Sequence, residues 1–399
     1  MTDIKNYCLV TAAYWGFTLT DGALRMLVLL HFYELGYSAV QIAFLFLLYE
    51  FCGIVTNLFG GWIGSHMGLK VTLFAGLILQ VVALFALGLL NQSWSSLFSV
   101  CYVMGLQALS GIAKDLTKMS SKSAIKVLVP EEADSALFKW VAVLTGSKNA
   151  LKGAGFFLGG LLLTLFGFRY SLWLLAAGLA LVLMATLFSL PREIGMAKKK
   201  TKFSTILSKS RDINLLSAAR LFLFGSRDIW FVVGLPVFLS SSLGWNHTQV
   251  GGFLAFWVIG YGGVQALTPK LLKNILGAGT PSGGTASAGA FALAGLTTLI
   301  AFGVAAELSP WLTVVTGLAL FGLIFAINSS VHSYLILAYT EADQAALNVG
   351  FYYMANATGR LAGTLLSGVV FQLAGLIGCL WASAGFVLIA AGISLLLKR

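Results

Sequence analysis

Apolar runs of about twenty residues recur along this chain, and short polar breaks separate them. A run of about 20 apolar residues crosses the hydrocarbon layer of a membrane as a helix, because each helical residue adds 1.5 Å. Backbone groups in lipid must be hydrogen-bonded within the segment itself, so long apolar runs predict helices and not a barrel. We place about twelve predicted spans at residues 7–30, 38–62, 70–90, 95–113, 140–166, 170–190, 213–239, 249–268, 288–306, 311–337, 346–373 and 376–397.

Composition supports an all-α membrane protein. Apolar residues make up 58% of the chain and charged residues only 10%, whereas a soluble domain carries about 25% charged residues. The first span lacks a cleavage-type end and carries charges in its middle, so we expect no signal peptide. The fold prediction is therefore a polytopic helical protein whose constant partner is the lipid bilayer.

The formal charge of +11 first suggests nucleic acid, but the placement of the charge favours another explanation. With the N-terminus inside, the cytoplasmic breaks collect nearly all the lysines and arginines outside the spans, and the external breaks hold only Arg169. The positive-inside rule then predicts a bacterial inner-membrane protein with both termini in the cytoplasm and no nucleic-acid partner. Lys114, Lys118, Lys122 and Lys126, each four residues from the last, form a basic stripe that we assign to the cytoplasmic rim.

The chain divides near its middle. The basic segment 191–212 reads as a cytoplasmic linker between an N-terminal six-helix bundle, residues 1–190, and a C-terminal six-helix bundle, residues 213–399. The motif Gly36-Tyr37-Ser38 with Gln41 returns as Gly244-Trp245-Asn246 with Gln249 at the same spacing. Such repetition is typical of transporters built from two related halves.

Two motifs carry a resemblance to the major facilitator superfamily. Residues 61–70, GWIGSHMGLK, follow that superfamily's loop signature in its glycines and terminal cation, with Ser65 and His66 in place of the usual acid and arginine. Gly146, Gly155 and Gly159 match the glycine spacing of its antiporter motif, although close helix packing explains these glycines equally well. The resemblance implies a twelve-helix fold of two six-helix halves related by pseudo-twofold symmetry.

Ionisable residues inside the predicted spans are the main functional signal. One charge at the bilayer centre costs roughly 2.5–3.5 kcal/mol, so these groups must line a cavity or form pairs. Six cations face three acids, which leaves a surplus of three positive charges and favours a polyanion site over a set of interhelical salt bridges. The predicted substrate-binding residues are the cations Arg25, Lys148, Lys152, Arg220, Arg227 and Arg360, together with the amides Asn149 and Asn356.

Three acids are candidates for proton coupling. Glu50 is alone on its helix, and Asp21 is four residues from Arg25 on one helix face. Asp228 is adjacent to Arg227, so we expect its better partner on another helix. Organophosphate antiporters of the superfamily clamp phosphate with an arginine on spans one and seven, an analogy that reaches Arg25 and Arg227. His31 and His332 are interpreted as ordinary boundary residues.

Four longer stretches resemble a narrower family, the ArsJ-type organoarsenical efflux permeases: YWGFTLTDGALRMLVLLHF, QALSGIAKDLTKMSSKSAIKVLVP, LTGSKNALKGAGFFLGG and SKSRDINLLSAARLFLFGSRDIWFVVGLP. This resemblance implies export of 1-arseno-3-phosphoglycerate, which glyceraldehyde-3-phosphate dehydrogenase makes when it accepts arsenate, and hence a functional link to that enzyme and arsenate resistance. Pentavalent arsenic in such a compound is recognised as phosphate would be. The dispersed cysteines suit neither trivalent arsenic nor another metal.

The sequence therefore favours a proton-coupled exporter that acts as a monomer, without a cofactor, a metal or catalytic residues. Two alternatives stay open. A general exchanger of organophosphates or organic anions fits the surplus of cations equally well, and a non-transporting membrane sensor lacks an appended soluble domain. The sequence shows no pattern of a nucleophile with a nearby base, so we expect no enzyme activity.

Overall fold

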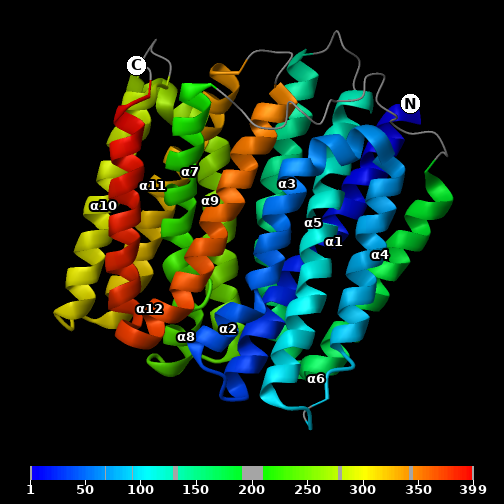
Figure 1. Cartoon of the computed structure of the whole chain (residues 1–399), viewed down its shortest axis with the longest axis horizontal. Coiled ribbons are helices and arrows are strands. Elements are labelled where there is room, and N and C mark those ends of the chain that lie inside the picture. The colour runs from blue at the N-terminus through cyan, green and yellow to red at the C-terminus, as the bar shows by residue number, and fades with distance from the viewer. Residues whose placement is uncertain are drawn as a thin grey trace. The chain divides into compact units, whose positions relative to one another are not determined.

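The computed structural model describes residues 2–67, 69–91, 93–128, 134–190, 210–276, 281–340 and 345–397. Within these ranges the regular structure is entirely helical (Figure 1). The predicted linker at 191–212 lies outside the described residues up to residue 209. The helices are α1 (Thr2–Glu34), α2 (Ala39–Leu45), α3 (Leu47–Met67), α4 (Leu69–Leu87), α5 (Ser96–Leu128), α6 (Asp134–Ser189), α7 (Arg211–Phe231), α8 (Gly234–Ser241), α9 (His247–Leu276), α10 (Gly283–Ala305), α11 (Pro310–Ala338) and α12 (Ala345–Leu395).

Each predicted span lies on one or two of these helices, and the all-α membrane fold is confirmed. Nine stretches of the described residues are long and apolar enough to cross a membrane. Two of them, Ser147–Ser189 and Asn348–Leu395, are 43 and 48 residues long, which is far more than one crossing needs. The predicted first span corresponds to α1, which carries Asp21 and Arg25.

Both overlong helices reverse direction at a glycine with positive φ, Gly167 (φ 69°) in α6 and Gly375 (φ 61°) in α12. The Ser171 hydroxyl lies 2.8 Å from the carbonyl oxygen of Leu162, nine residues earlier. A straight helix would separate such residues by about 13 Å along its axis. Each of these helices is therefore a hairpin of two spans, and Figure 1 shows the reversal in α12. Only glycine adopts this backbone conformation without strain.

The seventh predicted span is broken, because α7 ends at Phe231 and α8 begins at Gly234. Pro236 lacks an N–H and so removes one helical hydrogen bond at this point. The amides of Val233 and Gly234 instead donate to the Ser367 hydroxyl of α12, at 3.1 and 3.0 Å. A broken helix is tolerated inside a membrane when other groups satisfy its backbone in this way.

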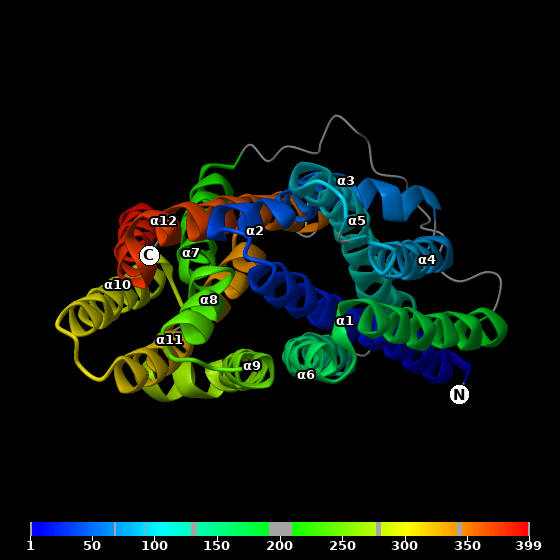
Figure 2. The same ribbon diagram turned by 90° about the horizontal axis from the view of Figure 1, so that it is seen from below.

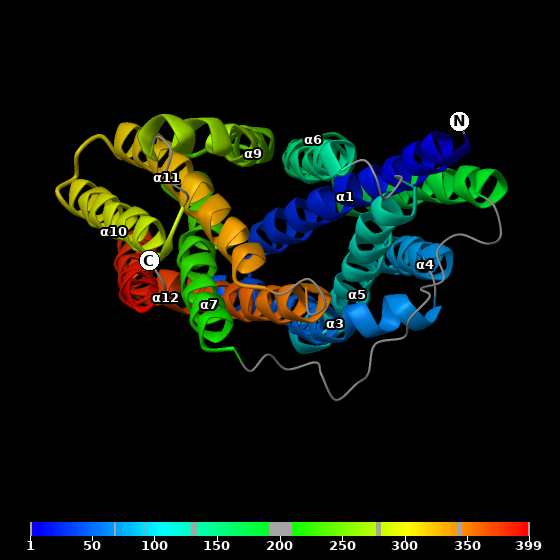
Figure 3. The same ribbon diagram turned by 90° about the horizontal axis from the view of Figure 1, so that it is seen from above.

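The chain forms two compact units. Unit 1 comprises residues 1–31, 55–204 and 247–259, and unit 2 comprises residues 32–54, 205–246 and 260–399. In unit 1, α4 packs against both α5 and α6; Figure 3 shows α4 beside α5. In unit 2, α12 packs against α7, α10 and α2; Figure 2 shows α2 along α12. The predicted division into residues 1–190 and 213–399 stays a prediction.

The same local geometry recurs 208 residues apart. Gly36 and Gly244, at the repeated sequence motif, both have positive φ, as do Gly167 and Gly375 at the two hairpin turns. Pairs that are 208 apart also make equivalent contacts. A Cβ on Gly160 of unit 1 would meet the carbonyl oxygen of His247, and a Cβ on Gly368 of unit 2 would lie 2.6 Å from the carbonyl oxygen of Ala39. The sequence repeat therefore reflects repeated packing within each unit.

Large apolar side chains point outward as well as inward. Phe188 is 83% exposed and Leu373 is 81% exposed. In water such exposure would be costly at about 25 cal/mol per Å², so these surfaces fit a lipid environment. A set of polar and charged side chains, by contrast, is buried, and this set includes Glu50, Asp115 and Arg220.

Candidate functional site

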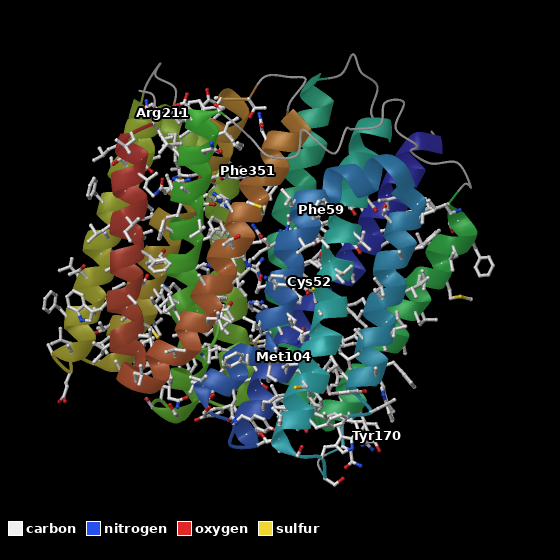
Figure 4. All side chains as sticks on the ribbon, viewed as in Figure 1. Cys52, Phe59, Met104, Tyr170, Arg211 and Phe351 are labelled. Carbon is white, nitrogen blue, oxygen red and sulfur yellow. The ribbon has the colours of Figure 1, made fainter. Side chains whose placement is uncertain are left out.

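Helix α7 presents three of the predicted charged residues to the interior of unit 2. Arg220 and Asp228 are 5% and 1% exposed, and the Arg227 side chain is 16% exposed. Arg220 and Arg227 are seven residues apart, which places them near one face of the helix. Figure 4 locates the start of α7 by Arg211 and the first turns of α12 by Phe351, both towards the same end of unit 2.

Four charged side chains of unit 2 form one connected network. Arg360 on α12 donates from Nη2 to Oε1 of Glu50 on α3, at 2.6 Å. Its Nε lies 3.5 Å from Oδ2 of Asp228. Arg227 donates from Nε to Oδ1 of Asp228, at 2.7 Å. Because Glu50 and Asp228 are almost fully buried, these contacts act with little screening by solvent. Two arginines and two carboxylates balance one another.

The pairing of Asp228 corrects part of our expectation. Adjacency was expected to keep Arg227 and Asp228 apart, yet the long arginine side chain folds back to its neighbour. The expected partner on another helix is also present, namely Arg360 at the longer distance of 3.5 Å. Asp228 therefore lies between two guanidinium groups.

Glycines bring α7 and α12 close enough for this network. A Cβ on Gly363 would lie 2.6 Å from the carbonyl oxygen of Gly225 and 2.8 Å from Cβ of Asp228. Gly359, which directly precedes Arg360, lies equally tightly against the backbone of Leu221. Small residues at helix crossings allow such approach in membranes. The crossing thus sets Arg360 beside Asp228.

Arg220 has a different environment, because its contacts within the described residues are neutral. Its Nε donates to Oδ1 of Asn356 at 3.1 Å, and its Nη1 donates to the carbonyl oxygen of Ser329 at 2.9 Å. The guanidinium carbon lies 3.8 Å from the ring centroid of Phe224 and 5.0 Å from that of Tyr352. Hydrogen bonds and aromatic faces stabilise the cation, but no contacting carboxylate neutralises its charge.

In unit 1 the predicted residues gather at the crossing of α1 and α6. Asp21 and Arg25 of α1 are 8% and 7% exposed. A Cβ on Gly22 would lie 2.6 Å from the carbonyl oxygen of Lys152, so the two backbones touch beside Asp21. Lys152 is partly buried and lies over the ring of Phe156, with 5.6 Å from Nζ to the centroid. Lys148 and Asn149, one turn earlier on α6, are also partly buried.

The antiporter-motif glycines serve this same crossing. A Cβ on Gly155 would meet the carbonyl oxygen of Leu19, and one on Gly159 would lie 2.5 Å from the carbonyl oxygen of Ala23. The packing explanation is therefore supported for these two residues. The side-chain environments of the loop signature up to residue 69, and of Lys122 and Lys126 in the basic stripe, lie outside the part of the chain that is described.

The 208-residue repeat relates the two charged clusters. It brings Lys152 onto Arg360, and Gly155 onto Gly363. The position equivalent to Glu50 is Val258, an apolar residue of unit 1. At the repeated position an apolar residue therefore replaces the acid that holds Arg360. The two units repeat a fold but distribute charge differently.

Sequence reasoning missed several polar residues. Asp115 of α5 is fully buried and accepts from Lys118 at 2.8 Å and from Thr56 at 2.7 Å. The fourth predicted span ends at residue 113, whereas α5 continues without interruption to Leu128, so part of the basic stripe packs inside unit 1. Ser329 of α11 was not predicted either, although it contacts Arg220 through two atoms.

His332 was interpreted as a boundary residue, but it is fully buried on α11. Neither of its ring nitrogens has a hydrogen-bond partner within the described residues. The four cysteines are all unbridged and lie on α1, α3, α5 and α12. Across the described ranges, no group of three or more His, Cys, Asp and Glu side chains is placed to hold a metal ion.

A family model places this chain among known proteins. The family model described as Major Facilitator Superfamily matches residues 8–305. A solved structure titled as a D-xylose-proton symporter aligns with a TM-score of 0.71 at 13% identity, covering 98% of this chain and 96% of that one. A POT family transporter in complex with 5-aminolevulinic acid aligns with a TM-score of 0.71 at 15% identity, covering 97% and 94%. A comparison with curated proteins gave no match. At these identities the two structures establish the fold alone.

Proposed function

Since this chain belongs to the major facilitator superfamily and is a membrane transporter rather than an enzyme, we propose that it exports an organic anion carrying phosphate or arsenate groups. Within that class we propose 1-arseno-3-phosphoglycerate, moved out of the cytoplasm by alternating access, with arsenate resistance as the result. The narrower identity is supported by the four stretches that resemble ArsJ-type permeases. The enzyme that supplies the substrate is glyceraldehyde-3-phosphate dehydrogenase.

One observation carries the choice of an anion. Arg220 is a buried cation whose contacts among the described residues are all neutral, while Arg227 and Arg360 balance Glu50 and Asp228. A buried charge that lacks an opposite charge costs several kcal/mol. An anionic substrate supplies that opposite charge, and a neutral or cationic drug does not.

The remaining predicted cations are proposed substrate residues as well. In unit 1, Arg25, Lys148 and Lys152 outnumber Asp21, which gives this set a surplus of two positive charges. Lysine offers phosphate a mobile point charge, and arginine offers a planar fork. Asn149 and Asn356 are proposed to complete recognition through hydrogen bonds. Arg227 and Arg360 would contribute once their carboxylate partners release them.

Export against a gradient requires coupling, and we propose protons as the coupling ion. Asp228 supports this proposal because its Oδ2 is buried without a hydrogen-bond partner among the described residues, 3.5 Å from Nε of Arg360. Protonation of Asp228 or Glu50 would weaken their hold on Arg360 and free it for the anion. Asp21 is the corresponding candidate in unit 1. A proton gradient that fails to drive uptake into inverted vesicles would remove this part of the proposal.

We further propose that the protein lies in a bacterial inner membrane with both termini in the cytoplasm and acts as a monomer. The positive-inside rule supports this orientation, because Arg169 is the only lysine or arginine in the predicted external connections. Reporter fusions to each terminus test it. A terminus that reports from outside the cytoplasm would reverse the orientation.

The decisive experiment uses an arsenic-sensitive bacterial strain that expresses the transporter with glyceraldehyde-3-phosphate dehydrogenase. We expect growth in arsenate and no protection against arsenite, because trivalent arsenic seeks thiolates and not cations. The matched controls are the strain without the dehydrogenase and the strain with an Arg220→Gln transporter. Arsenate sensitivity that is unchanged by the transporter would overturn the assignment to organoarsenical export.

A general organophosphate exchanger is the second candidate, and the same surplus of cations favours it. Transport assays in inverted vesicles, with the arsenylated compound generated in the assay itself, distinguish the two candidate functions. Export of 1-arseno-3-phosphoglycerate with weak competition by 3-phosphoglycerate supports the narrow function. Equal handling of both compounds supports the general exchanger.

A further inference from the structure

We propose that Arg220, Ser329 and His332 form a binding subsite for one tetrahedral oxyanion, of the phosphate and arsenate class, within unit 2. The inference rests on the proposed function in one respect only, namely that the oxyanion belongs to the transported substrate. All three residues lie on α7 and α11, and two of them were not among the residues predicted from the sequence. The subsite is separate from the network in which Arg227 and Arg360 balance Asp228 and Glu50.

The Ser329 hydroxyl is surrounded by donors. Its oxygen is approached by Nη1 of Arg220 at 3.2 Å, by the hydroxyl of Tyr261 at 3.3 Å and by Nε2 of Gln265 at 3.2 Å. A hydroxyl oxygen has two lone pairs, so three donors exceed what it accepts. All three distances are at the long end for hydrogen bonds. The cluster therefore has more donor capacity around Ser329 than this oxygen uses.

His332 is the second, independent observation. It lies three residues after Ser329 on α11, so the two side chains share a helix face. Arg220 bonds to Ser329 through two acceptor atoms, so this face of α11 is the one that meets Arg220. His332 is fully buried, and both of its nitrogens lack hydrogen-bond partners within the described residues. Buried polar groups are normally satisfied, and an unsatisfied one suggests a missing ligand or water.

The charge of Arg220 indicates that the ligand of His332 is an anion and not water. Water would satisfy His332 but would leave the guanidinium without a negative charge. An oxyanion satisfies both, because its oxygens accept from His332, Arg220 and the donors now crowded on Ser329. The ring of Phe224, 3.8 Å from the guanidinium carbon, covers one face of Arg220, so ligand contacts are confined to the plane of the guanidinium group.

Donor directions favour a tetrahedral group over a carboxylate. A planar carboxylate is satisfied by one bidentate arginine. Here the donors come from α7, α9 and α11, through Arg220, Gln265 and His332. A phosphate or arsenate group presents three outer oxygens in different directions, which matches donors on several helices.

The test measures anion binding by the purified full-length protein in detergent, through the change in unfolding temperature followed by tryptophan fluorescence. Inorganic phosphate and arsenate are titrated at constant ionic strength, with acetate as the carboxylate control. We expect saturable stabilisation by phosphate and arsenate and none by acetate. Titration with 3-phosphoglycerate, and its competition with inorganic phosphate, tells whether a phosphate ester occupies the same subsite. Equal effects of acetate and phosphate would overturn the tetrahedral assignment.

Variants assign the binding to these residues. Ser329→Ala is expected to raise the half-saturating phosphate concentration by about 2- to 10-fold, the range for one lost hydrogen bond. Ser330→Ala is the matched control, because within the described part of the chain the Ser330 hydroxyl bonds only to the carbonyl oxygen of Ala326. We expect Arg220→Gln to abolish binding and Arg211→Gln, an exposed change on the same helix, to leave it unchanged.

His332 needs a comparison of two substitutions. His332→Phe removes both polar atoms and is expected to weaken phosphate binding, whereas His332→Gln keeps a donor and should retain most of it. Phosphate binding by Arg220→Gln with the half-saturation of the unmodified protein would refute the subsite, as would equal values for Ser329→Ala and Ser330→Ala.

The two proposals fail separately. Phosphate binding that depends on Arg220, in a protein that gives no arsenate resistance, retains the subsite and rejects the export function. Export and resistance that persist in Arg220→Gln retain the function and reject the subsite.

Discussion

Arg360 on α12 and Glu50 on α3 are 310 residues apart in the chain, yet Nη2 of Arg360 lies 2.6 Å from Oε1 of Glu50. Glu50 is fully buried, and the Arg360 side chain is 16% exposed. A carboxylate at such a position needs a cation, because removing it from water costs several kcal/mol. This pair therefore ties the second predicted span to the eleventh inside unit 2.

Breaking this pair from one side is expected to cost more than removing both charges. Arg360→Gln leaves Glu50 buried without its closest cation and should lower the free energy of unfolding by about 3–5 kcal/mol. The double variant Glu50→Gln with Arg360→Gln should recover part of that loss. Denaturant or thermal unfolding of both single variants and the double variant measures the coupling. Additive losses would contradict a direct interaction.

Ser367 is expected to stabilise the break between α7 and α8. Its hydroxyl accepts from the amides of Val233 and Gly234, so Ser367→Ala leaves two buried N–H groups unsatisfied. Each such group costs about 1–3 kcal/mol, and we expect a total loss within 2–5 kcal/mol.

Ser394→Ala is the matched control for Ser367→Ala. Ser394 is equally buried on α12, but its hydroxyl bonds only to the carbonyl oxygen of Ala390 in its own helix. The control should change unfolding by less than about 1 kcal/mol. Equal losses in the two variants would mean that the broken backbone finds other partners.

The sequence predicted the helical fold and the places of its helices because lipid imposes a simple rule on length and polarity. It also predicted the repeat, because the backbone has a positive φ at both Gly36 and Gly244, the glycines of the repeated motif. It predicted that buried cations exist, since Arg25 and Arg220 lie inside apolar runs. Each of these features depends on residues that are close together in the sequence, so the sequence pattern is enough to predict it.

Tertiary contacts were beyond such patterns. Ser329 lies 109 residues from Arg220, and a serine in a membrane helix carries no signal that distinguishes a ligand from a helix-bonded hydroxyl. The burial of His332 depends on how α11 faces α7, which hydropathy does not encode. Helix spacing alone predicts that Asp228 has its better partner on another helix. The Arg227 side chain is long enough to bond to its neighbour nevertheless.

Gly363 is expected to be intolerant of a methyl group. In Gly363→Ala the new Cβ would lie 2.6 Å from the carbonyl oxygen of Gly225, so α7 and α12 must separate. Overpacking of this kind costs about 1–3 kcal/mol. Because Asp228 lies at the same crossing, we also expect lower transport activity.

Gly385→Ala provides the control on the same helix. No atom of the described residues lies within 4 Å of its added Cβ, and alanine favours a helix over glycine by up to about 1 kcal/mol. The control should therefore be neutral or slightly more stable. Thermal unfolding of the two variants side by side checks the contrast, and a stable Gly363→Ala would contradict the close crossing.

Lys152 provides the last prediction, which depends on the proposed anion export. It is one of the cations proposed to bind the anion, and the repeat places it at the position of Arg360. We therefore expect Lys152→Gln to raise the KM for the exported anion by about 10- to 100-fold, the range for a hydrogen bond to a charged group. Lys152→Arg keeps the charge and should recover part of the affinity. Uptake into inverted vesicles measures KM and kcat separately, and unfolding temperature verifies folding.

Lys270→Gln is the control for this measurement, because Lys270 is an exposed lysine on α9. Its KM should match that of the unmodified protein at physiological salt, where an exposed charge is screened beyond about 8 Å. If Lys152 served only helix packing, Lys152→Gln would have a lower unfolding temperature, but the folded protein would keep the KM of the unmodified protein. A rise in KM without loss of stability is the outcome that assigns Lys152 to the substrate.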